Sequence, residues 1–167
     1  ERSIQVYDLL SRLCTEGGLT VIAARPSLGK TSLALNIACN VAEKQQRVAV
    51  FSLEMPKGQL VRRLLGSEAR VDGNRIRTGQ LHKDDWPKLA DAAGSLSEMP
   101  IWIDDTPAIT MLELRAKARR LKSEIGLSMI VVDYLQLMRS GSRNDSREQE
   151  ISEISRSLKA LAKELEI

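Results

Sequence analysis

The chain has 167 residues, which is enough for one domain with a single sizeable core. Charged residues make up 28% and hydrophobic residues 43% of it, so we expect a soluble globular protein. The net charge of +3 permits an anionic partner, whereas an aromatic content of only 3% argues against a platform for stacking nucleic-acid bases.

The sequence also argues against a membrane protein and against several kinds of catalytic site. No apolar run reaches the roughly 18 residues of a membrane span and no secretory signal opens the chain, so we expect a cytoplasmic location and no membrane partner. Cys14 and Cys39 are best explained as small buried hydrophobic residues. His82 is the only histidine, which leaves little support for a histidine metal site or a Ser-His-Asp triad.

The first part of the chain is expected to lead into a buried strand. Four apolar residues in the first 16 positions could form one helical stripe, which suits a leading helix or a linker: Ile4, Tyr7, Leu10 and Leu13. The apolar, β-branched run 19–23 predicts the first strand. The run 32–42 is rich in helix formers, so a helix is expected to follow after a short loop.

The loop between that strand and that helix has the frame of a phosphate-binding loop, with Ala24 where the usual pattern has its first glycine. Since one methyl group replaces one hydrogen, position 24 need not adopt a positive φ. Unpaired N–H groups and the helix dipole favour an anion at a helix N-terminus, so we expect the loop to bind the phosphates of a nucleotide. The predicted nucleotide-binding residues are Ala24, Arg25, Pro26, Ser27, Leu28, Gly29, Lys30 and Thr31.

The last three residues of this loop carry most of its expected chemistry. Gly29 lets the backbone close around phosphate oxygens without a Cβ in the way. Lys30 can place a positive charge on the β- and γ-phosphates, and the Thr31 hydroxyl can bind Mg²⁺. The simpler alternative is an ordinary strand–turn–helix in which the lysine occurs by chance.

Strands and helices are expected to alternate through the rest of the chain. A second strand over 47–53 ends at Glu54, and with the preceding strand and helix it predicts a parallel βαβ unit. Capping boxes at Thr110 and Ser146 predict two helix starts. The segments that follow the second strand are a helix over 59–69, an irregular stretch over 70–83, a helix over 84–98, a strand over 100–104, a basic helix over 110–124, a strand over 128–133 and a helix after Ser146.

The strand over 128–133 ends in a Walker B pattern, because the apolar run 130–132 leads directly to Asp133. An aspartate at this place can hold, directly or through water, the Mg²⁺ that Thr31 also binds. Tyr134 follows instead of a glutamate, so the attacking water must be activated from elsewhere. Glu54 is the candidate general base, and its alternative interpretation is a solvated carboxylate in a loop.

This alternation predicts an α/β fold with a mostly parallel sheet and helices on both faces. In such sheets ligands bind outside the carboxyl ends of the strands. The loop 24–31, Glu54 and Asp133 are all expected at those ends, so they can converge on one crevice. Asp104 and Asp105 lie there too, but turn and capping roles explain them better than metal binding.

Five stretches of the chain match, in order, the motifs of one known family. They are Ala-Arg-Pro-Ser-Leu-Gly-Lys-Thr (24–31), Phe-Ser-Leu-Glu-Met (51–55), Ile-Asp-Asp-Thr-Pro (103–107), Val-Asp-Tyr-Leu-Gln-Leu (132–137) and Glu-Ile-Ser-Arg-Ser-Leu-Lys-Ala-Leu-Ala-Lys-Glu-Leu (153–165). With the stretch 75–79 and the segment around Trp86, they resemble the motor domain of the bacterial replicative DNA helicases, the DnaB family. The resemblance covers about 17–167 and includes the alanine at position 24.

The resemblance implies a RecA-like P-loop NTPase fold and a homohexameric ring around one DNA strand. It implies 5′→3′ translocation driven by ATP hydrolysis, with unwinding of duplex DNA at the replication fork. Glu54 is then the catalytic carboxylate, Lys30 and Thr31 act on phosphate and magnesium, and Asp133 is the Walker B acid. The implied cofactors are ATP and Mg²⁺, and the implied partners are single-stranded DNA, a primase and a helicase loader.

The resemblance also implies a chain longer than this one. The family chain continues past Ile167 with a strand that bears a glutamine sensing the γ-phosphate, with further DNA-contacting loops and with an arginine finger for the neighbouring subunit. A separate amino-terminal domain precedes the motor, and residues 1–16 fit its linker only loosely. We therefore expect a linker or leading helix over 1–16 and a partial RecA-like ATPase motor domain over 17–167.

The polar loop 139–146 is the candidate DNA contact, through Arg139, Arg143 and Arg147. The resemblance implies that loops after the Walker B strand face the central channel of the ring. A basic loop there could follow a phosphate backbone without reading bases. The alternative is a solvated linker whose arginines pair with nearby acids, which are Asp145, Glu148 and Glu150.

Two other functions stay open on the sequence. A RecA-type strand-exchange or regulatory ATPase shares the phosphate-binding loop and the Walker B pattern, but it should lack the stretches 51–55 and 132–137. A non-catalytic nucleic-acid-binding module that keeps ATP as a structural ligand has no need of an intact Lys30, Glu54 and Asp133.

Overall fold

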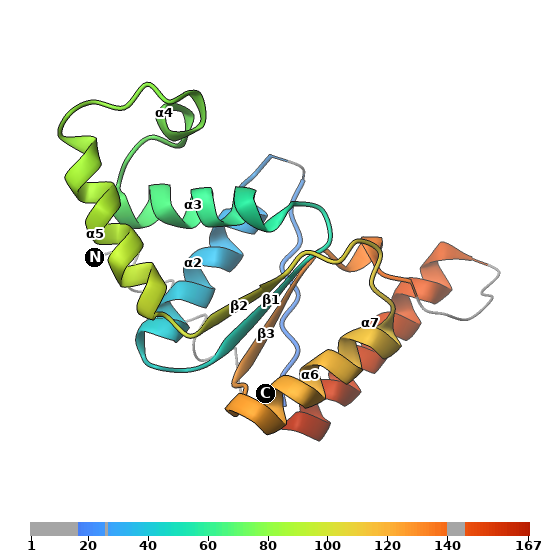
Figure 1. Ribbon diagram of the computed structural model, residues 1–167. Coiled ribbons are helices and arrows are strands. Elements are labelled where there is room, and N and C mark those ends of the chain that lie inside the picture. Colours follow the sequence, from blue (N-terminus) through green and yellow to red (C-terminus); the bar gives the residue numbers. More distant parts are fainter. Residues whose placement is uncertain (1–16, 26, 140–145) are drawn as a thin grey trace, which may run out of the picture.

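A three-stranded parallel sheet lies at the centre of the computed structural model, which describes residues 17–25, 27–139 and 146–167 (Figure 1). The strand order is β2-β1-β3, with β1 at Val48–Ser52, β2 at Ile101–Asp104 and β3 at Met129–Asp133. Ser52 pairs with Asp133 at the carboxyl ends of the two strands. The predicted parallel α/β architecture is confirmed, while the expected helix or linker over 1–16 lies outside the described residues.

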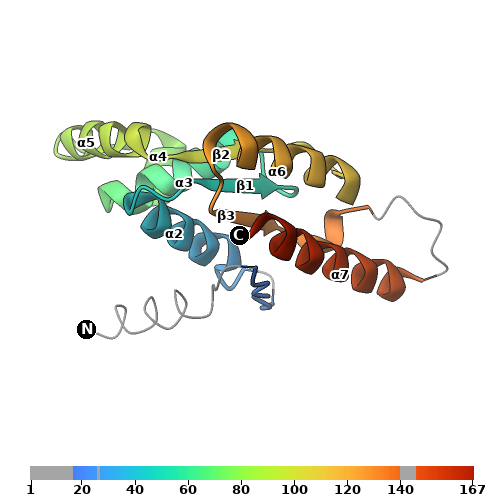
Figure 2. The ribbon, with the colours of Figure 1, turned by 90° about the horizontal axis from the view of Figure 1, so that it is seen from below.

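Helices cover both faces of this sheet, as predicted. Two groups of helices flank it on opposite sides, and Figures 1 and 2 show α6 and α7 running side by side, away from α2, α3 and α5. The helices are α2 (Lys30–Glu43), α3 (Lys57–Ala69), α4 (Gly73–Thr78), α5 (Asp85–Glu98), α6 (Met111–Ile125) and α7 (Arg147–Leu165), with a short 3₁₀ turn η1 (Leu135–Leu137). In the described part of the chain, no helix combines the length and the apolar character that crossing a membrane requires.

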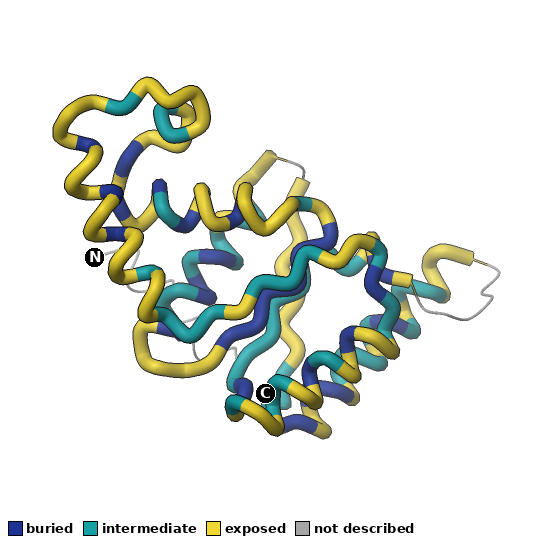
Figure 3. The backbone as a smooth tube through the Cα atoms, viewed as in Figure 1, coloured by how far each residue is buried: buried dark blue, intermediate teal, exposed yellow. Residues whose placement is uncertain are grey.

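Strand β1 is buried along its whole length, which explains why it is the dark blue centre of Figure 3. Its side chains alternate between two cores because successive residues of a strand point to opposite faces. Val48 and Val50 pack with residues of α2 and α3, whereas Ala49 and Phe51 pack with residues of α6 and α7. This double burial fixes the register of the strand, and therefore fixes where Glu54 emerges.

The prediction of a first strand over 19–23 is wrong. This run lies outside the three-stranded sheet, and Figure 1 draws it as a blue coil and not as an arrow. Its apolar side chains are exposed, with Val21 at 69%. A strand needs a backbone partner as well as β-branched residues, and among the described residues none of β1, β2 and β3 pairs with it. The expected βαβ unit between 19–23 and β1 is therefore not formed.

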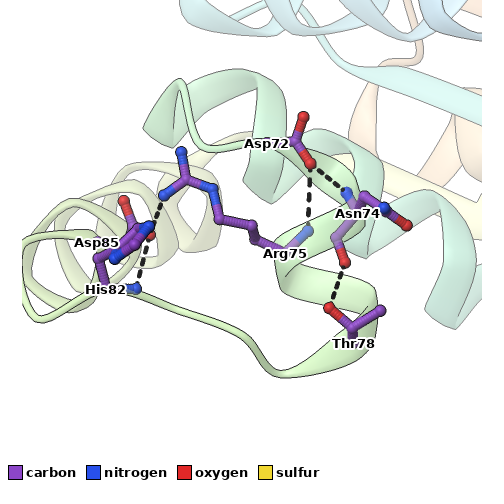
Figure 4. A network of polar contacts seen from close by, with 6 residues as sticks. All are labelled: Asp72, Asn74, Arg75, Thr78, His82 and Asp85. Carbon is purple, nitrogen blue, oxygen red and sulfur yellow. Dashed lines mark hydrogen bonds and ion pairs between the residues drawn. The ribbon is translucent and has the colours of Figure 1, made fainter.

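The segment expected to be irregular, 70–83, contains the short helix α4. Asp72 caps it by accepting hydrogen bonds from the N–H groups of Asn74 (2.8 Å) and Arg75 (3.2 Å), and Gly79 ends it at a φ of 74°. The guanidinium of Arg75 donates to Asp85 at 2.8 Å, which joins α4 to the start of α5 (Figure 4). The N–H of His82, together with Arg75, lowers the pKa of Asp85. Six residues are too few to show a helical period, so the sequence pattern missed this helix.

The two helix starts predicted at capping boxes are both present. Thr110 accepts from the N–H of Glu113, whose carboxylate accepts from the N–H of Thr110, so the first box is complete and α6 ends at Gly126 as predicted. Ser146 accepts from the N–H of Gln149 at 3.2 Å and caps α7. The basic side chains expected on α6 are each engaged with a carboxylate or a carbonyl group: Arg115, Lys117, Arg119, Arg120 and Lys122.

Candidate functional site

The loop 24–31 delivers the N-terminus of α2 to the carboxyl end of the sheet. Gly29 caps α2 with a φ of 85°, a conformation that favours glycine. Its chain neighbours and the backbone of α2 aside, no atom of the described residues lies within 4 Å of the place where its Cβ would stand. Ala24 has no positive φ, as predicted, although Ser27 adopts 66°. The loop residues before Lys30 are exposed, and Lys30 and Thr31 are half-buried, while Pro26 lies outside the described residues.

Thr31 and Asp133 bring the phosphate-binding loop and the Walker B strand together. The Oγ1 of Thr31 donates a hydrogen bond of 2.6 Å to the Oδ2 of Asp133, the last residue of β3. Asp133 is 8% exposed, so this hydroxyl group contacts a carboxylate that is largely shielded from solvent. Hydroxyl and carboxylate oxygens are ligands that Mg²⁺ accepts, and this ion usually takes its other ligands from water and substrate phosphates.

Lys30 lies over the aromatic ring of Tyr134, with its Nζ 4.9 Å from the ring centroid. A cation at this distance is attracted by the negative face of the ring. The ring therefore holds the lysine against the residue that follows the Walker B aspartate in the chain. The sequence analysis noted Tyr134 only because it stands where a glutamate could follow Asp133, and it did not predict the contact with Lys30. The signal that could have indicated the contact is the position of Tyr134 directly after the Walker B aspartate.

Glu54 is exposed on the turn that connects β1 to α3. The N–H of Leu53 donates to the backbone oxygen of Asp133 at 2.7 Å, so this turn starts beside the Walker B aspartate. The buried Oγ of Ser52 donates to the carbonyl oxygen of Met55 at 2.7 Å and accepts from its N–H at 3.3 Å. These bonds give the turn that carries Glu54 a defined shape.

The two aspartates at the carboxyl end of β2, the last residue of the strand and the one after it, take the turn and capping roles expected of them. Asp104 accepts from the N–H of Thr106 at 2.9 Å and from the ammonium group of Lys117. Partial burial raises the pKa of Asp104, but these hydrogen bonds outweigh it and the net pKa is lowered. Asp105 accepts from the backbone N–H of Lys57 at 2.9 Å. In the described ranges no group of three acidic, histidine or cysteine side chains could hold a metal ion.

The three arginines expected to contact DNA are in different situations. The backbone of Arg139 pairs with Ile109 and Met111, and the residue is exposed. The guanidinium of Arg147 contacts the carbonyl oxygens of Gln136 and Met138 and the carboxylate of Glu150. Arg143 lies outside the described residues. Both Arg139 and Arg147 are exposed, but the guanidinium of Arg147 is already engaged within the protein.

Comparison with known proteins identifies relatives over nearly the whole chain. Residues 5–167 match the family described as DnaB-like helicase C terminal domain. The chain is 58% identical to the replicative DNA helicase DnaB of Geobacillus stearothermophilus and 56% identical to the replicative DNA helicase DnaC of Bacillus subtilis. Each alignment covers 89% of this chain and 33% of the relative, so the chain spans about a third of the length of these curated relatives.

Solved structures agree with the sequence relatives. One, described as a DnaB-like replicative helicase and its interactions with primase, superposes with a TM-score of 0.87 at 35% identity, over 92% of this chain and 38% of that chain. Another, described as an ATPase domain, superposes with a TM-score of 0.83 at 30% identity, over 99% of this chain and 67% of that chain.

Proposed function

The chain belongs to the family of DnaB-like helicase C-terminal domains, and on that premise we propose that it is the ATP-hydrolysing motor of a replicative DNA helicase. The observation that carries the proposal is the hydrogen bond between Thr31 and Asp133. It places a hydroxyl group from the phosphate-binding loop and a carboxylate from the Walker B strand at one point, which is the arrangement that a magnesium–nucleotide complex requires.

Each residue of the site has a separate role in this proposal. Lys30 binds the β- and γ-phosphates of ATP, and the ring of Tyr134 holds its ammonium group in the absence of nucleotide. The oxygens of Thr31 and Asp133 hold Mg²⁺, which neutralises charge on the phosphates when it is bound. The carboxylate of Glu54 accepts a proton from the water that attacks the γ-phosphate, so that ADP and phosphate are the products.

The proposal extends to an assembly of which this chain is one part. We infer a homohexameric ring that moves 5′→3′ along single-stranded DNA in the cytoplasm, because the family resemblance implies it. A primase and a helicase loader are the proposed protein partners, and one of the structural neighbours is described with its interactions with primase. Arg139 and Arg143 are the proposed phosphate contacts of the loop after β3, whereas the contacts of Arg147 favour a role in holding the base of that loop.

Unwinding of a forked duplex by the complete protein tests this function. We expect strand separation that requires ATP and Mg²⁺, and we expect it to be abolished in Lys30→Ala. A matched variant, Lys44→Ala, removes a lysine just after the last residue of α2 and should unwind normally. ATP hydrolysis without unwinding would favour a strand-exchange or regulatory ATPase. The absence of both hydrolysis and unwinding would favour a non-catalytic binding module.

A further inference from the structure

Asp105 forms a hydrogen bond that the reaction described above does not use. Its Oδ2 accepts the backbone N–H of Lys57 at 2.9 Å, and Lys57 is the first residue of α3. The residue at the N-cap of this helix is Pro56, which makes no side-chain capping bond. A carboxylate from the loop after β2 therefore performs the capping that the helix lacks locally, and its negative charge suits the positive end of the helix dipole.

This cap lies at one end of the short turn that carries Glu54. At the other end, the buried Oγ of Ser52 bonds both backbone polar groups of Met55. Glu54 lies between these two anchors, three residues before Lys57. Ser52 fixes the start of the turn to β1, and Asp105 fixes its end to the neighbouring strand β2, whose carboxyl end lies beside that of β1 (Figure 1).

We propose that Asp105 is a positioning residue that holds the turn bearing Glu54 in the orientation that hydrolysis requires. The inference rests on the proposed function of Glu54 as the general base. A base acts only within hydrogen-bonding reach of the water, and a displacement of about 1 Å can reduce a rate about a hundredfold. Without the cap, the N–H of Lys57 bonds only to water, and the segment from Glu54 to Lys57 has one anchor to the protein fewer.

Two substitutions separate positioning from direct catalysis. Asp105→Ala removes the acceptor and should lower kcat for ATP hydrolysis by about tenfold to a hundredfold. The KM for ATP should change little, because the hydrogen bond that is removed joins Asp105 to α3 and not to the phosphate-binding loop. Asp105→Asn keeps an acceptor oxygen for the N–H of Lys57 and should restore kcat close to the wild-type value. A carboxylate that itself accepted the proton would not tolerate asparagine.

Asp72→Ala is the matched control, because it removes another carboxylate that caps a helix start, that of α4. It should lower the melting temperature to a similar extent while leaving kcat unchanged. In a Glu54→Gln background, Asp105→Ala should cause no further drop in turnover, since the group that it positions is already gone.

The measurements are steady-state ATPase kinetics and melting temperature on the complete, assembled protein. Wild-type kcat in Asp105→Ala, or an equal drop of kcat in Asp72→Ala, would overturn the positioning role while leaving the proposed function intact. If Asp105→Asn were as inactive as Glu54→Gln, the positioning role would also be overturned, and Asp105 would itself be a proton acceptor. Full turnover by Glu54→Gln would overturn both the assignment of the base and the inference that depends on it.

Discussion

Thr31 and Asp133 are 102 residues apart in the sequence and are joined by a hydrogen bond of 2.6 Å from the hydroxyl of Thr31 to the carboxylate of Asp133. Thr31 belongs to the first turn of α2, and Asp133 is the last residue of β3. The bond therefore depends on the packing of α2 against the sheet, through Leu35 and Ala38 on the side of Val48 and Val50. The candidate site is a product of the tertiary fold and not of one local motif.

The first prediction concerns nucleotide binding by Lys30. Lys30→Ala removes a cation from the phosphate-binding loop, and a charge-assisted hydrogen bond contributes about 1.5–3 kcal/mol. The affinity for ATP should therefore fall by about tenfold to a hundredfold. Titration of the complete protein with a fluorescent ATP analogue measures this change, with Lys44→Ala as the matched lysine control. Equal affinities in wild type and Lys30→Ala would show that the loop does not bind the phosphates.

The second prediction concerns turnover and Glu54. Glu54→Gln keeps the size of the side chain and removes its ability to accept a proton. ATP should still bind, whereas kcat should fall by about 10²–10⁴-fold. Single-turnover hydrolysis by the complete, assembled protein separates the chemical step from binding, and Glu98→Gln at the end of α5 provides a carboxylate control away from the site. Turnover near the wild-type rate would move the role of base to another group.

The sequence was sufficient for elements in which local preference and tertiary packing agree. Strands β1, β2 and β3 were predictable because apolar β-branched runs end at polar residues, and most of these side chains are buried or half-buried in the sheet. The start and end of α6 were predictable because the capping bonds of Thr110 and the positive φ of Gly126 are local properties. The placement of Asp133 at the carboxyl edge of the sheet followed from parallel strands, whose carboxyl ends meet at one edge. Its contact with Thr31 depends instead on the packing of α2, since the strand expected before the loop is not formed.

The sequence was insufficient to predict features that depend on contacts with residues distant in the chain. The run 19–23 has the composition of a buried strand, but it is exposed and lies outside the sheet of described strands. The contact of Lys30 with Tyr134 and the capping of α3 by Asp105 join residues far apart in the chain. Such contacts depend on the relative positions of elements, which periodicity does not encode.

The third prediction concerns the pH dependence of stability at the capping box of α6. The N–H of Thr110 and then its hydroxyl group donate to the carboxylate of Glu113, and these bonds lower the pKa of Glu113 below its ordinary value of 4.5. A carboxylate whose pKa is lower in the folded state stabilises the fold above the unfolded pKa, and this contribution disappears as the pH falls through the folded pKa. Wild type should therefore melt at a higher temperature than Glu113→Gln near neutral pH.

The difference between the two proteins should shrink as the pH falls well below 4.5, because protonated Glu113 resembles glutamine. Thermal melts of both proteins over a pH series measure it, with Glu98→Gln as a carboxylate control on another helix. A difference in melting temperature that stays constant with pH would show that ionisation of Glu113 does not contribute through the capping box.

The last prediction concerns DNA and the loop after β3. Arg139 is exposed at the start of this loop, and Arg143 follows it outside the described residues. If both contact the phosphate backbone, replacing them with alanine should weaken binding of single-stranded DNA equally for all sequences. The slope of log K against log[salt] should become shallower by about 0.7 for each phosphate that the protein no longer neutralises. ATP binding measured without DNA should not change.

Arg147→Ala is the matched control for this experiment, because its guanidinium already contacts Gln136, Met138 and Glu150. We expect this variant to lower the melting temperature and to leave the salt slope unchanged, since it removes an interaction within the protein and none with DNA. Salt titrations of single-strand affinity for the assembled complete protein compare the three forms. If the double variant Arg139→Ala, Arg143→Ala kept the affinity and salt slope of the wild type, the loop would be a linker that does not contact DNA. If Arg147→Ala changed the salt slope, Arg147 would belong to the DNA-binding site.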